Sequence, residues 1–564
     1  MMKRTFILYT FVAILGVATY ASNRTDAEMR SIAVRHLRGS STRGATPAAQ
    51  QLTLEMKDNY LSICSAEGRG FVVVSRDNTF PAVLGSSATA IDMSNLPEGF
   101  RWWLQAASRS LQERLESGEW YVRTRSESPV EPFLATKWDQ VAPYNLKCPK
   151  IATENCPTGC VATAAAQIMK YYNYPAQGRG TSKYEKNGIP RTKEINGVYD
   201  WANMQNTYAK TQKTLTKETE AVATLLADVG AACGMNYTGN YGSATMDNCA
   251  KALVNNFRYD SLSLNMYYRY FFDDAEWKDI VYNELSNKRP VLYAGSPNNP
   301  EEGAGHAFVF HGLNAEGMVY VNWGWSGICD GYYDINVLQP GKDAVQKGDY
   351  SADGQIIIGF NPTETPSDDV EEKSIWATDT ICSFFIEGDS LMLKARRIIN
   401  YNYRSFRGQL LVAFENINGV EEDSYSVLLH DTEDEEGEPI QQYWGFVFNN
   451  EEHDKYGQEA ICNLKNDSLK AGTYIVTLGS QALHEPEISP MRYYKGIKCQ
   501  AMLVKGENGS VKLSELTPTG IKSTKAAAIR TPSSIYDLHG RKLGTDASMV
   551  RKGIYIIDGK LVVR

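Results

Sequence analysis

Histidine and positive charge are both scarce in this sequence. Only seven of its 564 residues are histidine, and 66 Asp and Glu outnumber 58 Lys and Arg, which gives a formal net charge of -8. A chain with this charge and no basic block lacks the electropositive surface by which proteins bind nucleic acid. Beyond the first twenty residues, no apolar run is long enough to cross a bilayer. We therefore expect no nucleic-acid partner and no membrane-spanning domain.

The N-terminal residues have the pattern of a secretory signal. Lys3 and Arg4 precede an apolar run over residues 6–17, and the small residues Thr19 and Ala21 follow at cleavage-site distance. The run is too short for a stable membrane span. A buried N-terminal helix is the alternative interpretation. The pattern favours a signal peptide over residues 1–21, and hence a secreted or cell-surface protein.

Residues 22–128 have the sequence pattern of a separate α+β unit. Residues 26–37 have helical spacing, four extended runs follow between residues 51 and 85, and residues 99–120 read as an amphipathic helix. The unit ends in the polar stretch VRTRSESPVEP, which we expect to be an exposed, protease-sensitive linker containing Arg123 and Arg125.

In residues 129–361 the helical patterns come first along the chain and the strand-like patterns come later. Helical patterns cover residues 218–235, 247–257 and 274–288, and strand-like runs such as PVLYAG, HAFVFHGLN and GQIIIGF follow. Segregation of helices from strands along the chain is typical of an α+β domain.

The remaining chain is predicted to be all β. A linker rich in Pro, Thr and acidic residues follows residue 361, and short strand patterns separated by turn residues continue to about residue 517. This spacing favours a β-sandwich of immunoglobulin-like type over residues 362–517. Residues 518–564 contain short strands joined by glycine turns.

The stretch NCPTGCVATAAAQIMKYY places a thiol at the start of a helix rich in alanine. Cys160 follows Gly159 and Thr158, a possible helix cap, and the unsatisfied N–H groups of the first turn favour negative charge there. The free N–H groups and the helix dipole both lower the pKa of a cysteine at this position, and the thiolate is the nucleophilic form. The alternatives are a buried or disulfide-bonded cysteine, or a zinc or redox site with Cys148 and Cys156. The latter is weak because no histidine lies near them.

A cysteine nucleophile needs a base, and this region contains only two histidines. His306 begins an apolar strand, whereas His311, five positions later, points to the opposite face. Asn322 follows on the next strand and is a candidate to accept the imidazole N–H, with Trp323 shielding that bond from water. Gln140 is a candidate to donate to an oxyanion together with the backbone N–H of Cys160.

These motifs resemble a known family. The stretches TGCVATAAAQIMKYYNYP, GHAFVFHG and VNWGWSGICDGYY, in the order Gln140, Cys160, His306, Asn322, closely resemble the streptopain-like family of secreted bacterial cysteine peptidases, which includes interpain. GFVVVSRDNTFPAVLG resembles the propeptide of that family, so the likeness covers residues 25–361. Residues 518–564 resemble the sorting domains of type IX secretion cargo.

The resemblance implies a papain-like fold and a zymogen. Cys160 would be the nucleophile and His306 the base; Asn322 and Trp323 would support the histidine, and Gln140 would contribute to the oxyanion hole. The implied partners are protein or peptide substrates and the chain's own propeptide as an intramolecular inhibitor, with no metal and no cofactor. The β-sandwich is a candidate to bind a surface or a protein partner.

Three departures from the family pattern and two rival functions remain, and one of the departures is the added thiol of Cys329. LGSS stands where an aromatic residue usually follows the propeptide glycine, and Ser326 stands where glycine is common. A transglutaminase or cell-wall amidase also uses a Cys-His pair, but with an acid as the third residue. A surface adhesin with a degenerate catalytic domain would lack catalytic residues that this chain retains.

Overall fold

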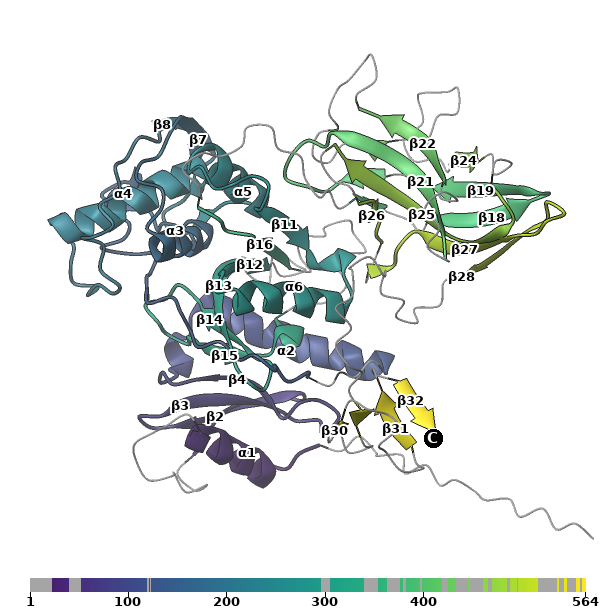
Figure 1. Ribbon diagram of the computed structural model, residues 1–564. Coiled ribbons are helices and arrows are strands. Elements are labelled where there is room, and N and C mark those ends of the chain that lie inside the picture. Colours follow the sequence, from purple (N-terminus) through teal and green to yellow (C-terminus); the bar gives the residue numbers. More distant parts are fainter. Residues whose placement is uncertain are drawn as a thin grey trace, which may run out of the picture. The chain divides into compact units, whose positions relative to one another are not determined.

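The chain folds into alternating helical and β regions in the order shown in Figure 1. The computed structural model describes residues 23–39, 52–118, 121, 123–295, 305–338, 354–362, 376–378, 382–395, 398–417, 425–432, 440, 445–446, 460–464, 469–483, 487–493, 496–515, 535–536, 542–544, 554–557 and 560–563. The predicted signal peptide over residues 1–21, residues 363–373 of the linker NPTETPSDDVEEK and most of the sorting-like segment lie outside these residues.

A single antiparallel sheet of ten strands joins the N-terminal region to the later one. In spatial order its strands are β1 (Thr53–Lys57), β2 (Leu61–Ala66), β3 (Gly70–Ser75), β4 (Val83–Ser87), β15 (Gly331–Tyr333), β14 (Val319–Asn322), β13 (His306–Leu313), β12 (Val291–Gly295), β16 (Gln355–Ile358) and β11 (Asn265–Tyr268). The junction is the pairing of β4 with β15, in which Ser86 lies opposite Tyr332. The predicted α+β unit over residues 22–128 therefore shares its sheet with the region that follows it.

The alternation of side chains along β3 separates two apolar cores. Val72 and Val74 face one core, which contains Met29 and Leu37 of α1 (Asp26–Gly39). Phe71 and Val73 face the main core together with Trp103 of α2 (Glu98–Ser117). Because successive residues of a strand point to opposite faces, one buried strand is covered by a helix on each side.

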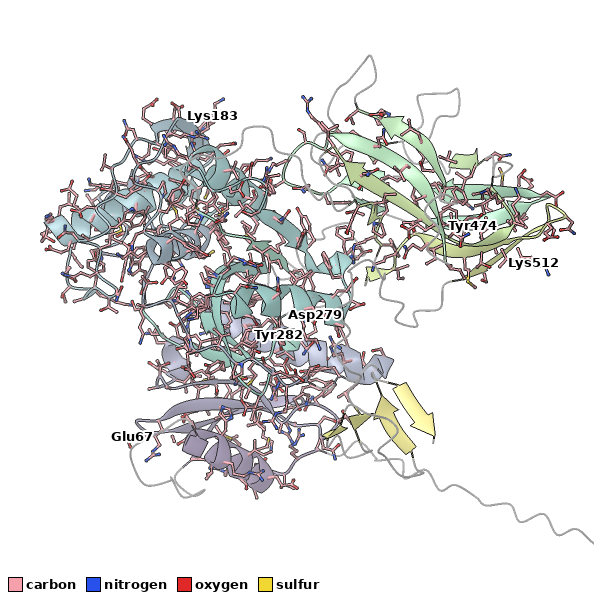
Figure 2. All side chains as sticks on the ribbon, in the orientation of Figure 1. Glu67, Lys183, Asp279, Tyr282, Tyr474 and Lys512 are labelled. Atoms are coloured by element: carbon pink, nitrogen blue, oxygen red, sulfur yellow. The ribbon has the colours of Figure 1, made fainter. Side chains whose placement is uncertain are left out.

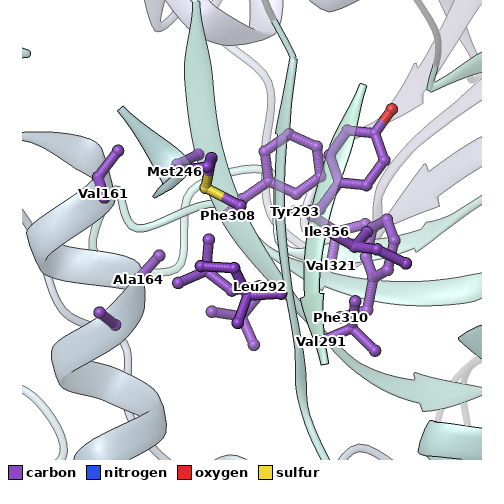
Figure 3. Packing of buried hydrophobic residues seen from close by; sticks show 14 of the residues in the cluster. Val161, Ala164, Met246, Val291, Leu292, Tyr293, Phe308, Phe310, Val321 and Ile356 are labelled. Atoms are coloured by element: carbon purple, nitrogen blue, oxygen red, sulfur yellow. The ribbon is translucent and has the colours of Figure 1, made fainter. Parts of the chain in front are cut away.

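Helices cover the other half of the sheet. They are α3 (Cys160–Tyr172), α5 (Met246–Asn255) and α6 (Asp274–Ser286), while α4 (Lys217–Ala232) packs on α3, α5 and the strands Thr181–Lys186 and Ile189–Glu194. Figure 3 shows Val161 and Ala164 of α3 facing Leu292 and Phe308 of the sheet, and all four are buried. The small side chains of α3 permit this close approach. On α6, the Tyr282 hydroxyl, labelled in Figure 2, donates to the Gly317 carbonyl at 2.6 Å.

The short elements complete this region. They are β5 (Lys150–Ile151) with β6 (Glu154–Asn155), a sheet of β7 (Thr181–Lys186), β8 (Ile189–Glu194), β9 (Asn236–Tyr237) and β10 (Gly242–Ser243), and 3-10 turns at Met93–Asn95, Arg269–Phe271 and Ile335–Val337. The helices predicted over residues 26–37, 99–120, 218–235, 247–257 and 274–288 are confirmed to within a few residues at each end. The sheet of β7 to β10 was not predicted, because its strands are mostly exposed and carry no apolar alternation.

All named elements from residue 376 to residue 515 are strands, as predicted. They form three sheets: β17 (Trp376–Thr378), β20 (Ile398–Asn400) and β23 (Gly445–Phe446); β18 (Ser383–Glu387), β19 (Ser390–Ala395) and β24 (Ala460–Asn463); and β22 (Tyr425–Asp431), β21 (Gly408–Asn416), β25 (Gly472–Ala482), β27 (Gln500–Lys505) and β28 (Val511–Glu515), with β26 (Ser489–Pro490) beside β25. Tyr474, labelled in Figure 2, is buried in their common core.

The last residues form a separate small sheet of β30 (Lys542–Gly544), β29 (Ile535–Tyr536), β31 (Ile554–Ile557) and β32 (Lys560–Val563). The nine cysteines whose side chains the structure describes are all free. Within the described ranges, no helix combines the length and the apolar character that crossing a bilayer requires.

Candidate active site

A glycine with a left-handed backbone sets Cys160 at the first position of α3. Gly159 has φ of 83° and is the residue before the helix, and a Cβ added there would lie 2.6 Å from Met235. Both the backbone angle and the space therefore require glycine. The predicted cap at Thr158 is wrong, because its hydroxyl lies 2.7 Å from the Thr163 hydroxyl instead of on a helix N–H.

The Cys160 thiol is held in its neutral form in this conformation. Burial of the thiol raises its pKa above the ordinary value, and this effect outweighs hydrogen bonds from the backbone of Ala307 and Val161, which lower it. We predicted a lowered pKa from the helix start, and the structure shows the opposite direction because desolvation is the larger effect. The contact with Ala307 nevertheless places the thiol beside β13, one residue from His306.

His306 is turned toward the end of β14. Its Nε2 lies 2.8 Å from the carbonyl oxygen of Trp323, and because a carbonyl only accepts, Nε2 carries the proton. The ring stacks on Trp325 with centroids 4.4 Å apart. Burial lowers the pKa of His306 to about 4, which the Trp323 carbonyl only partly counters. The two pKa shifts thus both favour the neutral forms of thiol and imidazole in this conformation.

Asn322 lies behind the histidine in a closed amide network. Its Nδ2 donates to the Thr136 carbonyl at 2.7 Å and to Oε1 of Gln167 at 3.1 Å. Its Oδ1 accepts from Nε2 of Gln167 at 3.1 Å and from the backbone N–H of Gly324 at 3.0 Å. The predicted bond from His306 to Asn322 is therefore not among the contacts of the described residues: the neighbouring Trp323 carbonyl occupies that role.

Two tryptophans cover this network. Trp323 is fully buried, and its ring lies 5.3 Å from that of Trp325 with an interplanar angle of 3°. The Trp323 ring also contacts Phe100 and Trp103 of α2. The predicted shielding role of Trp323 fits this position, since the indole excludes water from the histidine side of the site.

Gln140 lies against the segment that leads into Cys160. Its carbonyl accepts from the backbone N–H of Thr158 at 2.9 Å, two residues before the thiol. Its own N–H donates to Oδ1 of Asp139 at 2.6 Å. The arrangement holds the Gln140 backbone at the mouth of α3, where an oxyanion donor is needed.

The N-terminal region covers the histidine side of the site. A Cβ added at Gly99 of α2 would lie 2.7 Å from Cζ2 of Trp325 and 3.0 Å from Cγ of His306. Near the same place, the Ser87 hydroxyl donates to the Asp330 carbonyl at 2.6 Å, and the Cys329 N–H donates to the Thr89 hydroxyl at 3.0 Å. Residues 22–128 thus pack directly on the candidate base.

The linker after α2 is exposed in one part and anchored to the protein in another. Arg123 donates to the fully buried Asp334 at 3.1 Å and to the Val83 carbonyl at 2.7 Å. The Tyr121 hydroxyl donates to the same Asp334 oxygen at 3.2 Å. Arg125 is exposed, as predicted for the whole linker, whereas Arg123 is anchored.

Comparison with known proteins identifies the region built around these residues. Residues 138–333 match the peptidase C10 family. A solved structure of a fragment of Prevotella intermedia prointerpain A is 31% identical, with a TM-score of 0.50, and the match covers 56% of this chain and 99% of that one. The chain belongs to the peptidase C10 family of cysteine peptidases. This confirms the predicted streptopain-like family and the mixed α/β papain-like region.

Two curated proteins with similar sequences support the same family assignment. Streptopain of Streptococcus pyogenes is 28% identical over 373 residues, which is 60% of this chain and 92% of that protein. The thiol protease/hemagglutinin PrtT of Porphyromonas gingivalis is 28% identical over 376 residues, and the match spans 62% of this chain and 42% of PrtT.

Sequence reasoning missed two residues of this site. Gln167, the partner of Asn322, lies seven positions after Cys160. This spacing puts both residues on the same face of α3 and is visible in the sequence. Gly99 carries no signal of its own, because its role depends on the packing of α2 against residues more than 200 positions away.

Proposed function

We propose that this C10 chain is a secreted cysteine endopeptidase made as an inactive precursor, which cleaves proteins or peptides through a Cys160 thiolate and a His306 imidazolium. The observation that carries the proposal is the position of the thiol. It accepts from the backbone of Ala307, next to His306, and a helix of the N-terminal region packs on His306. A nucleophile on the strand neighbour of its base, with the base covered by an earlier segment of the chain, is what a latent cysteine peptidase requires.

The neutral pair fits a latent state. Attack on a peptide needs a thiolate, but burial raises the pKa of Cys160 and lowers that of His306, so proton transfer between them is unfavourable. Removal of residues 22–128 takes away the α2 contact on the imidazole and admits water. The His306 ring then turns toward Cys160 and forms the ion pair, in which each charge stabilises the other.

The reaction then follows from the groups around the thiol. The thiolate attacks the scissile carbonyl carbon, and the developing oxyanion accepts from the Cys160 backbone N–H and the Gln140 side chain. His306 donates its proton to the leaving amine, leaving a thioester on Cys160. A water molecule, deprotonated by His306, attacks the thioester carbonyl and releases the acid product and the thiolate.

Asn322 and Trp323 support the base without reacting. The amide pair of Asn322 and Gln167 fixes the end of β14, and with it the Trp323 carbonyl that accepts from His306. The buried Trp323 indole protects this hydrogen bond from water. We retain both as positioning residues of the peptidase.

The remaining regions are assigned as follows. Residues 1–21 are the signal peptide, 22–128 the inhibitory propeptide, 129–361 the papain-like peptidase domain, 362–517 an immunoglobulin-like β-sandwich that binds a surface or protein partner, and 518–564 a sorting-like segment. The propeptide assignment is supported by its contacts on His306 and by the prointerpain A likeness. The named relatives support export of the chain to the cell surface or medium.

The test is autoprocessing of the precursor lacking residues 1–21, beside its Cys160→Ala variant. Wild type should shorten to a product that begins near residue 125, read by mass spectrometry, and should then hydrolyse casein, while the variant stays full length and inert. If wild type stays intact, and trypsin cleavage of the linker still releases no caseinolytic activity, the peptidase proposal fails.

A further inference from the structure

The carboxylate of Asp139 lies between the two halves of the candidate site. Asp139 is 7% exposed and directly precedes Gln140. Its Oδ1 accepts from the Gln140 backbone N–H at 2.6 Å. Its Oδ2 accepts from the Ser326 hydroxyl at 2.6 Å and lies 3.1 Å from Nζ of the exposed Lys210. Charge-assisted hydrogen bonds of this kind are short and strong.

Ser326 belongs to the loop that carries the tryptophan stacked on the base. Its backbone has φ of 57°, the left-handed region that favours glycine, so the residue is held there by its contacts. Its N–H donates to the Trp138 carbonyl at 3.0 Å, and its hydroxyl donates to Asp139. The adjacent Trp325 stacks on His306. One carboxylate therefore joins the Gln140 segment to the loop beside the histidine.

We propose that Asp139 is a positioning residue for catalysis, which fixes the Gln140 segment so that the Gln140 side chain reaches the oxyanion, and which uses the Ser326 hydroxyl to lock that segment to the Trp325 loop. The inference rests on the proposed peptidase function. Oxyanion donors act only when they are held at the place where charge develops, and a displacement of about 1 Å costs about 100-fold in rate. Asp139 touches no reacting atom and acts through Gln140.

The test uses the trypsin-activated enzyme and a fluorogenic peptide substrate. Asp139→Asn keeps the shape but removes the charge, and one carbonyl oxygen replaces the two carboxylate oxygens that accept from the Gln140 N–H, the Ser326 hydroxyl and Lys210. We expect kcat to fall ~10- to 100-fold with KM changed less than about threefold. Alkylation of Cys160 by iodoacetamide, which needs no oxyanion hole, should change less than about threefold. In a Gln140→Ala background, Asp139→Asn should cost less than about threefold in kcat, because both changes disable the same donor.

Asp228 is a matched control. It is also buried and accepts from a backbone N–H, that of Gly197 at 3.1 Å, and from a hydroxyl, that of Tyr199 at 3.0 Å, while Lys193 lies 3.1 Å away. Asp228→Asn should lower the melting temperature and leave kcat within about threefold of wild type. If Asp139→Asn does not fold, Ser326→Ala replaces it, with an expected fall in kcat of ~3- to 10-fold.

The outcomes separate the inference from the function on which it rests. If wild type is active, and Asp139→Asn keeps kcat within threefold or loses equally much in the Gln140→Ala background, the positioning role is overturned and the peptidase proposal stands. An equal loss of kcat in Asp228→Asn also overturns it, since the effect would then come from stability. A wild type without Cys160-dependent hydrolysis overturns both.

Discussion

Gly99 offers a direct test of how the precursor is kept inactive. This residue lies in the first turn of α2, where its Cα faces the imidazole of His306 and the indole of Trp325. Alanine is the better helix former, so Gly99→Ala does not disfavour the helix itself. The added methyl group meets the catalytic side of the site instead. We expect the variant precursor to lose part of its latency.

The magnitude follows from the distances. The new Cβ would lie 2.7 Å from Cζ2 and 3.1 Å from Cη2 of Trp325, whereas carbon atoms pack at about 3.5–4.0 Å. The helix or the indole must therefore move by about 0.8 Å. Overpacking of this kind costs ~1–3 kcal/mol. Because the clash exists only while α2 covers the site, the open form should become ~5- to 150-fold more populated.

The assay is the initial rate of autoprocessing of the purified precursor, followed by the loss of full-length chain on gels. Gly99→Ala should process ~5- to 150-fold faster than wild type. Arg101→Ala, which changes an exposed residue of the same helix, should process at the wild-type rate. Melting temperatures measured in a Cys160→Ala background separate loosened cover from general unfolding. A folded Gly99→Ala precursor that processes within twofold of wild type would refute the reasoning.

Three further outcomes are expected. Gln167→Ala removes the partner of Asn322, so the activated enzyme should lose ~10-fold in kcat and about 1–3 kcal/mol of unfolding free energy, measured by peptide hydrolysis and urea denaturation. Arg123→Ala leaves buried Asp334 without its cation and should cost the precursor about 2 kcal/mol and speed trypsin cleavage after Arg125, the linker site that remains. The folded pKa of His306, about 4, lies below its unfolded value of about 6.5, so the folded precursor binds fewer protons between these values. The stability that neutral His306 supplies is complete above pH 6.5 and is lost as pH falls toward 4, by up to about 3 kcal/mol. The unfolding free energies of Cys160→Ala with and without His306→Gln, measured at pH 7 and pH 4, give this loss.

The elements that carry their own signal were predictable. The amphipathic pattern before Gly118 and the apolar strand after His306 gave α2 and β13 with nearly correct bounds. Cys160 at a helix start and the small number of histidines were enough to nominate the nucleophile and the base. Each of these features depends on residues close together in the sequence, which periodicity and local chemistry can reveal.

The features that were missed depend on remote partners. The pairing of β4 with β15 joins strands about 250 positions apart, and neither strand records which edge it meets. The direction of the Cys160 pKa shift was predicted wrongly for the same reason. The helix start was visible in the sequence, but the desolvation of the thiol depends on the tertiary packing around it.

Contacts between segments far apart in the sequence also explain how the proposed precursor can hold every candidate catalytic residue and still be inactive. The proposed nucleophile, oxyanion segment and base lie on three separate stretches of the chain, around Cys160, Gln140 and His306. In the proposed function, burial and a turned imidazole hold the pair neutral, and the contact of α2 with His306 maintains this arrangement. Latency imposed in this way needs no change in any catalytic residue. In the proposed mechanism, a cut in the linker and the release of residues 22–128 together convert the neutral pair into the reactive one.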